Sequence, residues 1–191
     1  MEDRKIYILF TDTGTLFTRL IKIYTRESYN HVSIAFDDQL EEIYSFGRKK
    51  PANPFIGGFI REKLREGLFK RAKCVIYSCR VSEQEYKQMR AKVKKIEREK
   101  EKYRYNLIGL LAIILHFDLN RKNAFFCSQF VATILNEKKG LLMKPPSLTT
   151  PRDLMNIDEF NFVYQGMLHT YPVPEELVTT HLERISERLV G

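Results

Sequence analysis

The 191-residue chain has no tryptophan and only three cysteines, Cys74, Cys79 and Cys127. Three cysteines do not make the disulfide framework of a small secreted domain. No group of cysteines and histidines has the spacing of a zinc site, so the sequence predicts no metal and no other cofactor. The chain also has no internal repeat and no low-complexity tract. With 43% hydrophobic and 12% aromatic residues, it is typical of a globular protein rather than a disordered one.

Long apolar runs are absent as well. A helix that crosses a membrane needs about 20 apolar residues, and the strongest run, 107–115, is much shorter. The apolar run near the N-terminus, 6–10, is too short for the hydrophobic region of a signal peptide. We therefore expect a protein located in the cytoplasm.

The charge of the chain is unbalanced but not concentrated in a binding motif. Lysine and arginine outnumber aspartate and glutamate by 32 to 24, which gives a formal net charge of +8. Much of the positive charge lies in 87–104, mixed with glutamate, as on the solvated face of a helix. Basic residues with interleaved aromatics are not seen, so nucleic acid is not an expected partner. An anionic substrate or an acidic membrane surface would fit the charge.

The hydrophobic pattern predicts an α+β fold, with strands and helices following one another along the chain. Ser82 and Glu85 form a capping box before a long amphipathic helix whose apolar stripe ends at Tyr103. Residues 31–37 and 41–46 are expected to pair as a hairpin. The basic segment 47–53 resembles a loop. Further strands are expected at 6–10, 57–62, 74–81 and 161–166, and further helices at 16–24, 106–115 and 127–136.

The chain length suits one domain with a real core, followed by a short C-terminal extension. We assign residues 1–170 to the domain and 171–191 to a linker and an amphipathic helix, because Pro172 and Pro174 flank a short linker. The helix would pack on its own domain, on a second copy in a homodimer, or peripherally on a membrane. Its apolar stripe is Val178, Leu182, Ile185 and Leu189.

One cysteine and one histidine stand in segments that suit catalysis. Cys127 lies just before an apolar run with helical spacing, so its sulfur belongs to the first turn of a buried helix. Unpaired backbone N–H groups and the helix dipole stabilise a thiolate there. His31 begins a predicted strand and is the best candidate for a base. The alternative interpretation is an inert buried cysteine and a structural histidine.

The segments around these two residues, "NHVSIAF" at 30–36 and "FFCSQFVATIL" at 125–135, resemble the circularly permuted papain-like hydrolases. This is the permuted branch of the NlpC-type peptidase superfamily, which includes the YiiX/YaeF-like proteins. Lecithin retinol acyltransferase-like enzymes are more distant members. The resemblance covers roughly residues 5–166. It implies an antiparallel sheet packed against helices, with the histidine before the cysteine in the chain.

The resemblance also implies roles for individual residues. Cys127 would be the nucleophile and His31 the general base, with a third polar residue orienting the imidazole. The aligned position on the strand after the histidine strand carries Ser45, a weaker orienting group than a carboxylate. Glu42 and Glu62 are the other candidates for the third residue.

The expected function is that of a cysteine peptidase or amidase, which hydrolyses an amide bond through an acyl-enzyme. Small peptides of the cell-wall type are the commonest substrates in the family that the chain resembles. An acyltransferase or a lipid-ester or lipid-amide hydrolase, acting on an acyl substrate, is the second interpretation. A binding module that keeps the fold without catalysis is the third. The reactivity of the Cys127 thiol separates the two enzymes from the binding module.

Overall fold

The computed structural model describes residues 3–12, 28–50, 53–64, 66, 69, 71–106 and 123–172, with the side chains of 48–50 and 53–56 left aside. The helix predicted at 16–24, most of the one predicted at 106–115, and the C-terminal helix fall outside these residues. Within the described ranges, no helix is both long and apolar enough to span a bilayer.

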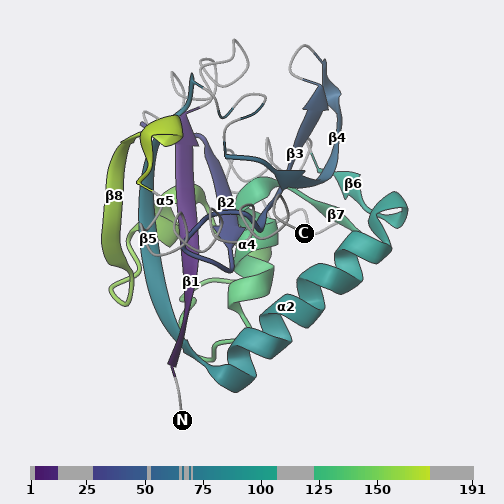
Figure 1. Ribbon diagram of the computed structural model, residues 1–191. Helices are drawn as coiled ribbons and strands as arrows, with labels where there is room; N and C mark the ends of the chain where they lie inside the picture. The colour runs from purple at the N-terminus through teal and green to yellow at the C-terminus, as the bar shows by residue number, and fades with distance from the viewer. Residues whose placement is uncertain are drawn as a thin grey trace, which may run out of the picture.

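A six-stranded antiparallel sheet forms the centre of the fold (Figure 1). Its strands lie side by side in the order β4–β3–β2–β1–β5–β8. Each strand therefore pairs with neighbours that run the opposite way, and β1 lies between β2 and β5. In chain order the strands are β1 (Asp3–Asp12), β2 (His31–Ala35), β3 (Ile43–Lys50), β4 (Asn53–Glu62), β5 (Lys73–Ser82) and β8 (Asn161–Met167).

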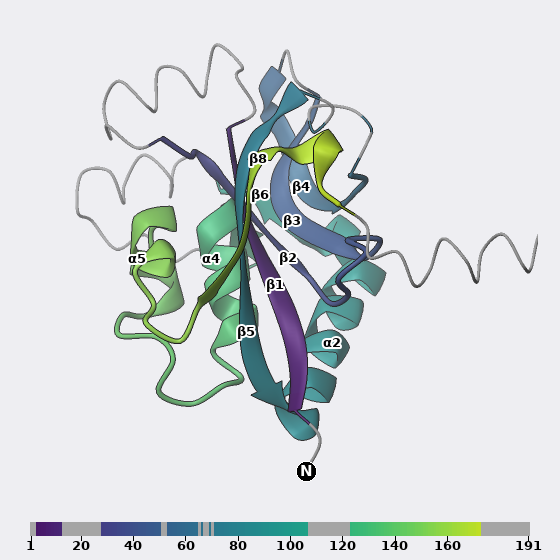
Figure 2. The ribbon, with the colours of Figure 1, turned by 60° about the vertical axis from the view of Figure 1, so that its left-hand side comes forward.

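The described α-helices lie between β5 and β8 in the chain. The long helix is α2 (Glu83–Arg98), and the predicted capping box of Ser82 and Glu85 is present at its start. The buried helix α4 (Cys127–Leu135) and the short α5 (Pro151–Met155) pack against each other, as Figure 2 shows. The remaining elements are the 3₁₀ turns η2 (Lys100–Lys102), η3 (Pro146–Leu148) and η4 (Leu168–Thr170) and a two-stranded parallel pair, β6 (Arg104–Tyr105) with β7 (Ala124–Phe125).

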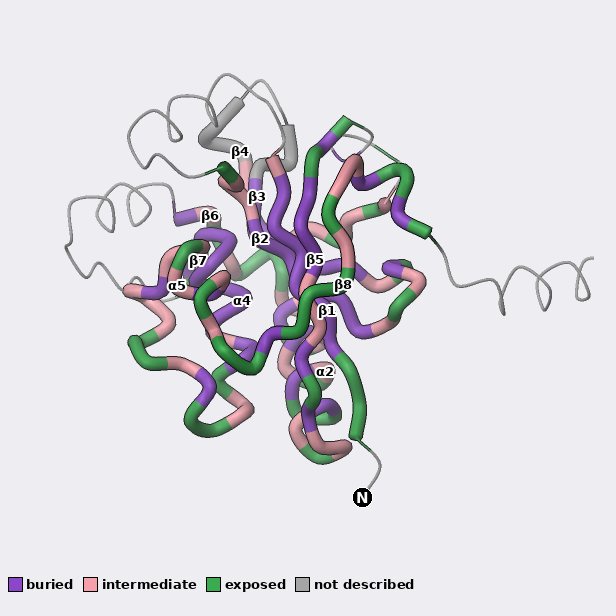
Figure 3. Tube along the Cα trace, turned by 90° about the vertical axis from the view of Figure 1, so that its left-hand side faces the viewer, coloured by how far each residue is buried: buried purple, intermediate pink, exposed green. Residues whose placement is uncertain are grey.

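Apolar side chains cover both faces of the sheet. Ile6, Ile8 and Phe10 of β1 share one core with the inner faces of α2 and α4, whereas Tyr7 and Leu9 belong to a second core on the other face. This explains why the middle of β1 is a continuous apolar run without alternation. Figure 3 shows the central strands buried along most of their length. Cys79 lies in the first core and Cys74 in the second, on opposite faces as strand alternation predicts.

The predicted α+β class, with an antiparallel sheet packed against helices, is confirmed. The hairpin of β2 and β3 is confirmed as well. The loop predicted at 47–53 is wrong, because β3 continues to Lys50 and β4 begins at Asn53. Basic residues and prolines suggest a loop locally, but pairing such as Gly47 with Gly58 satisfies the backbone and extends both strands.

Candidate active site

Cys127 is the first residue of α4. The residue before it, Phe126, offers no side-chain hydrogen bond to the free N–H groups of the first turn, and that turn has no acidic residue. The backbone N–H groups of Val32 and Ser128 instead hydrogen-bond the sulfur of Cys127. The thiol thus occupies the position at a helix N-terminus where an anion is most stabilised. Cys127 is 5% exposed to solvent.

His31 is the first residue of β2, where that strand meets the start of α4. Its ring forms a hydrogen bond with the Cys127 thiol. The ring nitrogen Nε2 lies 2.8 Å from Oε1 of Glu62, which leaves Nδ1 for the thiol. A Cβ atom at Gly47 would lie 3.2 Å from Cε1 of His31, so the lack of a side chain on that residue gives the imidazole its space.

The two groups shift each other's proton affinity in opposite directions. Burial by itself raises the pKa of the Cys127 thiol, but the hydrogen bond and charge of His31 and the N–H groups of Val32 and Ser128 bring this pKa below its ordinary value. Burial by itself lowers the pKa of His31, but the Glu62 carboxylate and the Cys127 sulfur raise it to about 10. These shifts favour a thiolate beside an imidazolium.

Glu62, the last residue of β4, connects three strands. Its Oε1 accepts a hydrogen bond from His31, a second from the hydroxyl of Ser33 at 3.2 Å and a third from the hydroxyl of Ser45. Because β3 lies between β4 and β2, the Glu62 side chain has to reach over β3. Small residues on that strand, Ser45 and Gly47, leave room for it.

Of the three candidates for the residue that orients His31, the structure places Glu62 against the imidazole. Ser45, the first choice from the sequence, does not take this position, since its hydroxyl donates to Glu62. The longer Glu62 side chain extends from β4 across β3 to His31 on β2, and Ser45 on β3 donates to it on the way.

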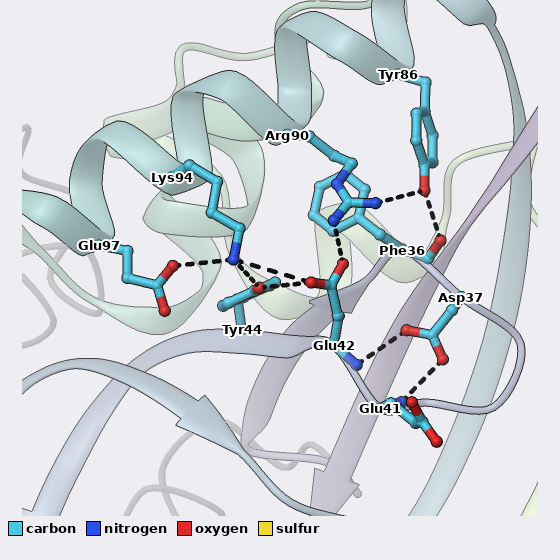
Figure 4. Close-up of polar contacts among 9 residues, drawn as sticks. All are labelled: Phe36, Asp37, Glu41, Glu42, Tyr44, Tyr86, Arg90, Lys94 and Glu97. Atoms are coloured by element: carbon cyan, nitrogen blue, oxygen red, sulfur yellow. Dashed lines mark hydrogen bonds and ion pairs between the residues drawn. The ribbon is translucent and has the colours of Figure 1, made fainter.

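Glu42, the residue before β3, belongs to a different network, which connects the β2–β3 hairpin with α2 (Figure 4). Its carboxylate lies 2.5 Å from Nη2 of Arg90 and 3.8 Å from Nζ of Lys94. Asp37 fixes the backbone before it by accepting from the N–H groups of Glu41 and Glu42. Glu42 therefore attaches α2 to the β2–β3 hairpin and lies apart from the cysteine and histidine.

The other two cysteines show what burial alone does to a thiol here. Burial raises the pKa of Cys74 to about 12 and that of Cys79 to about 11. Both side chains are fully buried, and Cys127 is nearly so. The contacts of Cys127 with His31 and with the N–H groups of Val32 and Ser128 therefore account for the different direction of its pKa shift.

Two residues of this site were not identified from the sequence. Ser33 is two residues after His31 on β2, and strand alternation could have placed it on the same face as the histidine. Gly47 had no comparable signal, because only the tertiary structure shows which atoms approach its Cα. Among the described residues, no group of three or more histidines, cysteines and acidic side chains could hold a metal ion.

No protein-family model, no curated protein and no solved structure matches this chain. The chemistry of the site therefore has to be argued from its own geometry.

Proposed function

We propose that the protein is a cysteine hydrolase that cleaves an amide bond, a peptidase or amidase, with Cys127 as nucleophile, His31 as acid and base, and Glu62 as the residue that orients His31. The observation that carries the proposal is the continuous chain of hydrogen bonds from the Cys127 thiol through the imidazole to the partly buried Glu62 carboxylate. A nucleophile, a base in contact with it and a third group that orients the base are the parts that covalent catalysis needs.

In the first half of the reaction, the Cys127 thiolate attacks the carbonyl carbon of the substrate. The oxygen of the tetrahedral intermediate takes the negative charge, and the backbone N–H of Cys127 at the start of α4 is the donor best placed for it. The His31 imidazolium then gives its Nδ1 proton to the departing amine as the C–N bond breaks. A thioester with Cys127 and a neutral imidazole remain.

In the second half, neutral His31 takes a proton from water, and the resulting hydroxide attacks the thioester carbonyl. The C–S bond breaks, the acid product leaves, and the thiolate and imidazolium are restored. Glu62 accepts from Nε2 throughout, so the imidazole keeps the same tautomer and the same orientation.

An amide substrate agrees with the strong hold of His31 on its proton. An amine leaves poorly unless it is protonated, and His31 carries at neutral pH a proton that it can give to the leaving amine. An activated ester, whose alcohol leaves unprotonated, makes no such demand on the site.

The test is acyl-enzyme formation. Wild-type protein mixed with p-nitrophenyl acetate should release nitrophenol in a burst that matches the protein concentration, and mass spectrometry should find the acetyl group on Cys127. Cys127→Ala and His31→Ala should abolish the burst, whereas Cys79→Ala should retain it. Glu62→Gln should slow acylation by about 10- to 100-fold. Acetylation spread evenly over the cysteines, or unaffected by His31→Ala, would contradict the proposal.

The same proteins should then be assayed on peptide anilides across pH. The value of kcat/KM should rise with pH as the Cys127 proton is lost and fall as pH passes about 10, where His31 loses the proton it must donate. A descending limb near the ordinary histidine pKa would show that Glu62 and the Cys127 sulfur do not hold the proton on His31 as proposed.

A further inference from the structure

Two buried serines converge on one oxygen of Glu62. Ser33 on β2 and Ser45 on β3 are both completely buried, and both hydroxyls donate to Oε1, the same atom that accepts from His31. Ile34 of β2 pairs with Tyr44 of β3. Because the strands are antiparallel, the next position in this register brings Ser33 opposite Ser45. The two hydroxyls are thus built into the sheet and fixed by its register.

Three donors on a single carboxylate oxygen restrict where the Glu62 carboxylate can lie. The Glu62 side chain is 13% exposed, so water offers it little solvation. Hydrogen bonds to a charged carboxylate are stronger than those between neutral groups. They also restrict the carboxylate from two sides, so that its third bond points to Nε2 of His31.

We propose that Ser33 and Ser45 are positioning residues, which hold the Glu62 carboxylate directed at His31, so that the reactivity of Cys127 depends on both serines through Glu62. This inference rests on the proposed function. It assigns Ser45 a different role from the one that its position in the sequence suggested, and it assigns a role to Ser33.

The experiment measures the rate of Cys127 carboxamidomethylation by iodoacetamide from about pH 4 to about pH 9. In Ser33→Ala and in Ser45→Ala, the Glu62 carboxylate loses one of the donors that direct it at His31, so the thiolate–imidazolium pair should be less stable. The labelling rate of Cys127 near pH 7 should therefore fall by about 10-fold. Ser78→Ala, which removes a hydroxyl from β5 of the same sheet, is the matched control and should leave this rate unchanged.

A double-mutant cycle separates positioning from general structural damage. In a Glu62→Gln background, Ser33→Ala or Ser45→Ala should cause no further loss of labelling rate, because the carboxylate through which the serines act has already been removed. Circular dichroism checks that each variant is folded. If an alanine variant does not fold, cysteine at the same position keeps the side-chain volume with only a weak donor, and its profile is interpreted in the same way.

The outcomes distinguish the two proposals. An unchanged labelling rate in both serine variants, or a full additional loss of rate in the Glu62→Gln background, overturns the role of the serines and leaves the proposed function standing. Wild-type Cys127 that labels no faster than Cys74 and Cys79 overturns the proposed function, and the role of the serines with it.

Discussion

Selective alkylation of one buried cysteine out of three is the most direct consequence of this site. All three thiols are nearly or fully buried, so accessibility alone predicts similar, slow reactions with iodoacetamide. Protonation predicts a large difference, because the thiolate is the species that reacts. At pH 7 the pKa of about 12 leaves about one Cys74 in 100,000 as thiolate, and the pKa of about 11 leaves about one Cys79 in 10,000.

Cys127 should carry a much larger thiolate fraction at the same pH, since contact with His31 lowers its pKa below the ordinary value, whereas burial raises those of the other two. A thiolate of low pKa is intrinsically less nucleophilic, which takes back about half of the advantage on a logarithmic scale. The expected result is that Cys127 reacts at least about 10-fold faster than Cys79, and faster still relative to Cys74.

The assay is a time course at pH 7 followed by peptide mass spectrometry, so that each cysteine gives its own rate. His31→Ala should slow Cys127 labelling to nearly the rate of the two strand cysteines. His169→Ala, which removes an exposed histidine from η4, is the matched control and should change nothing. Labelling in guanidinium chloride gives the reference rates of the unfolded chain. Equal folded-state rates for the three cysteines, or an unchanged Cys127 rate in His31→Ala, would refute the reasoning.

Two further predictions separate the site from the rest of the fold. Gly47→Ala places a Cβ 3.2 Å from Cε1 of His31 and should reduce thiol labelling by about 10-fold or more, as measured by the same time course. By contrast, Gly140→Ala, at a φ of +80° in open space, should cost about 1 kcal/mol of stability in a denaturant titration and leave labelling unchanged. Glu42→Gln breaks the partly exposed ion pair with Arg90 and should cost about 1 kcal/mol or less in the same titration, with normal labelling. Lost labelling in Glu42→Gln would mean that Glu42 acts on the site after all.

Local patterns in the sequence predict much of this protein's secondary structure correctly. The strand at 74–81 and the capping box at Ser82 depend on alternation and on hydrogen bonds between residues three apart, so no distant segment is needed to recognise them. The first turn of α4 is of the same kind, because a cysteine before a helical apolar run can be seen without knowing what packs on it. The loop prediction for 47–53 was wrong for the opposite reason, since the strands there depend on pairing with each other.

The sequence by itself therefore determined the α+β class, the helix start that holds Cys127 and the strand start that holds His31. Only the tertiary structure decided which group orients the imidazole. Ser45, Glu42 and Glu62 are all polar residues near strand ends, and their spacing along the chain does not rank them. The order of β4, β3 and β2 in the sheet directs Glu62 across β3 to His31, while contacts with α2 direct Glu42 to Arg90. Strand order depends on the burial of the whole sheet between two cores, which is a property of the entire chain.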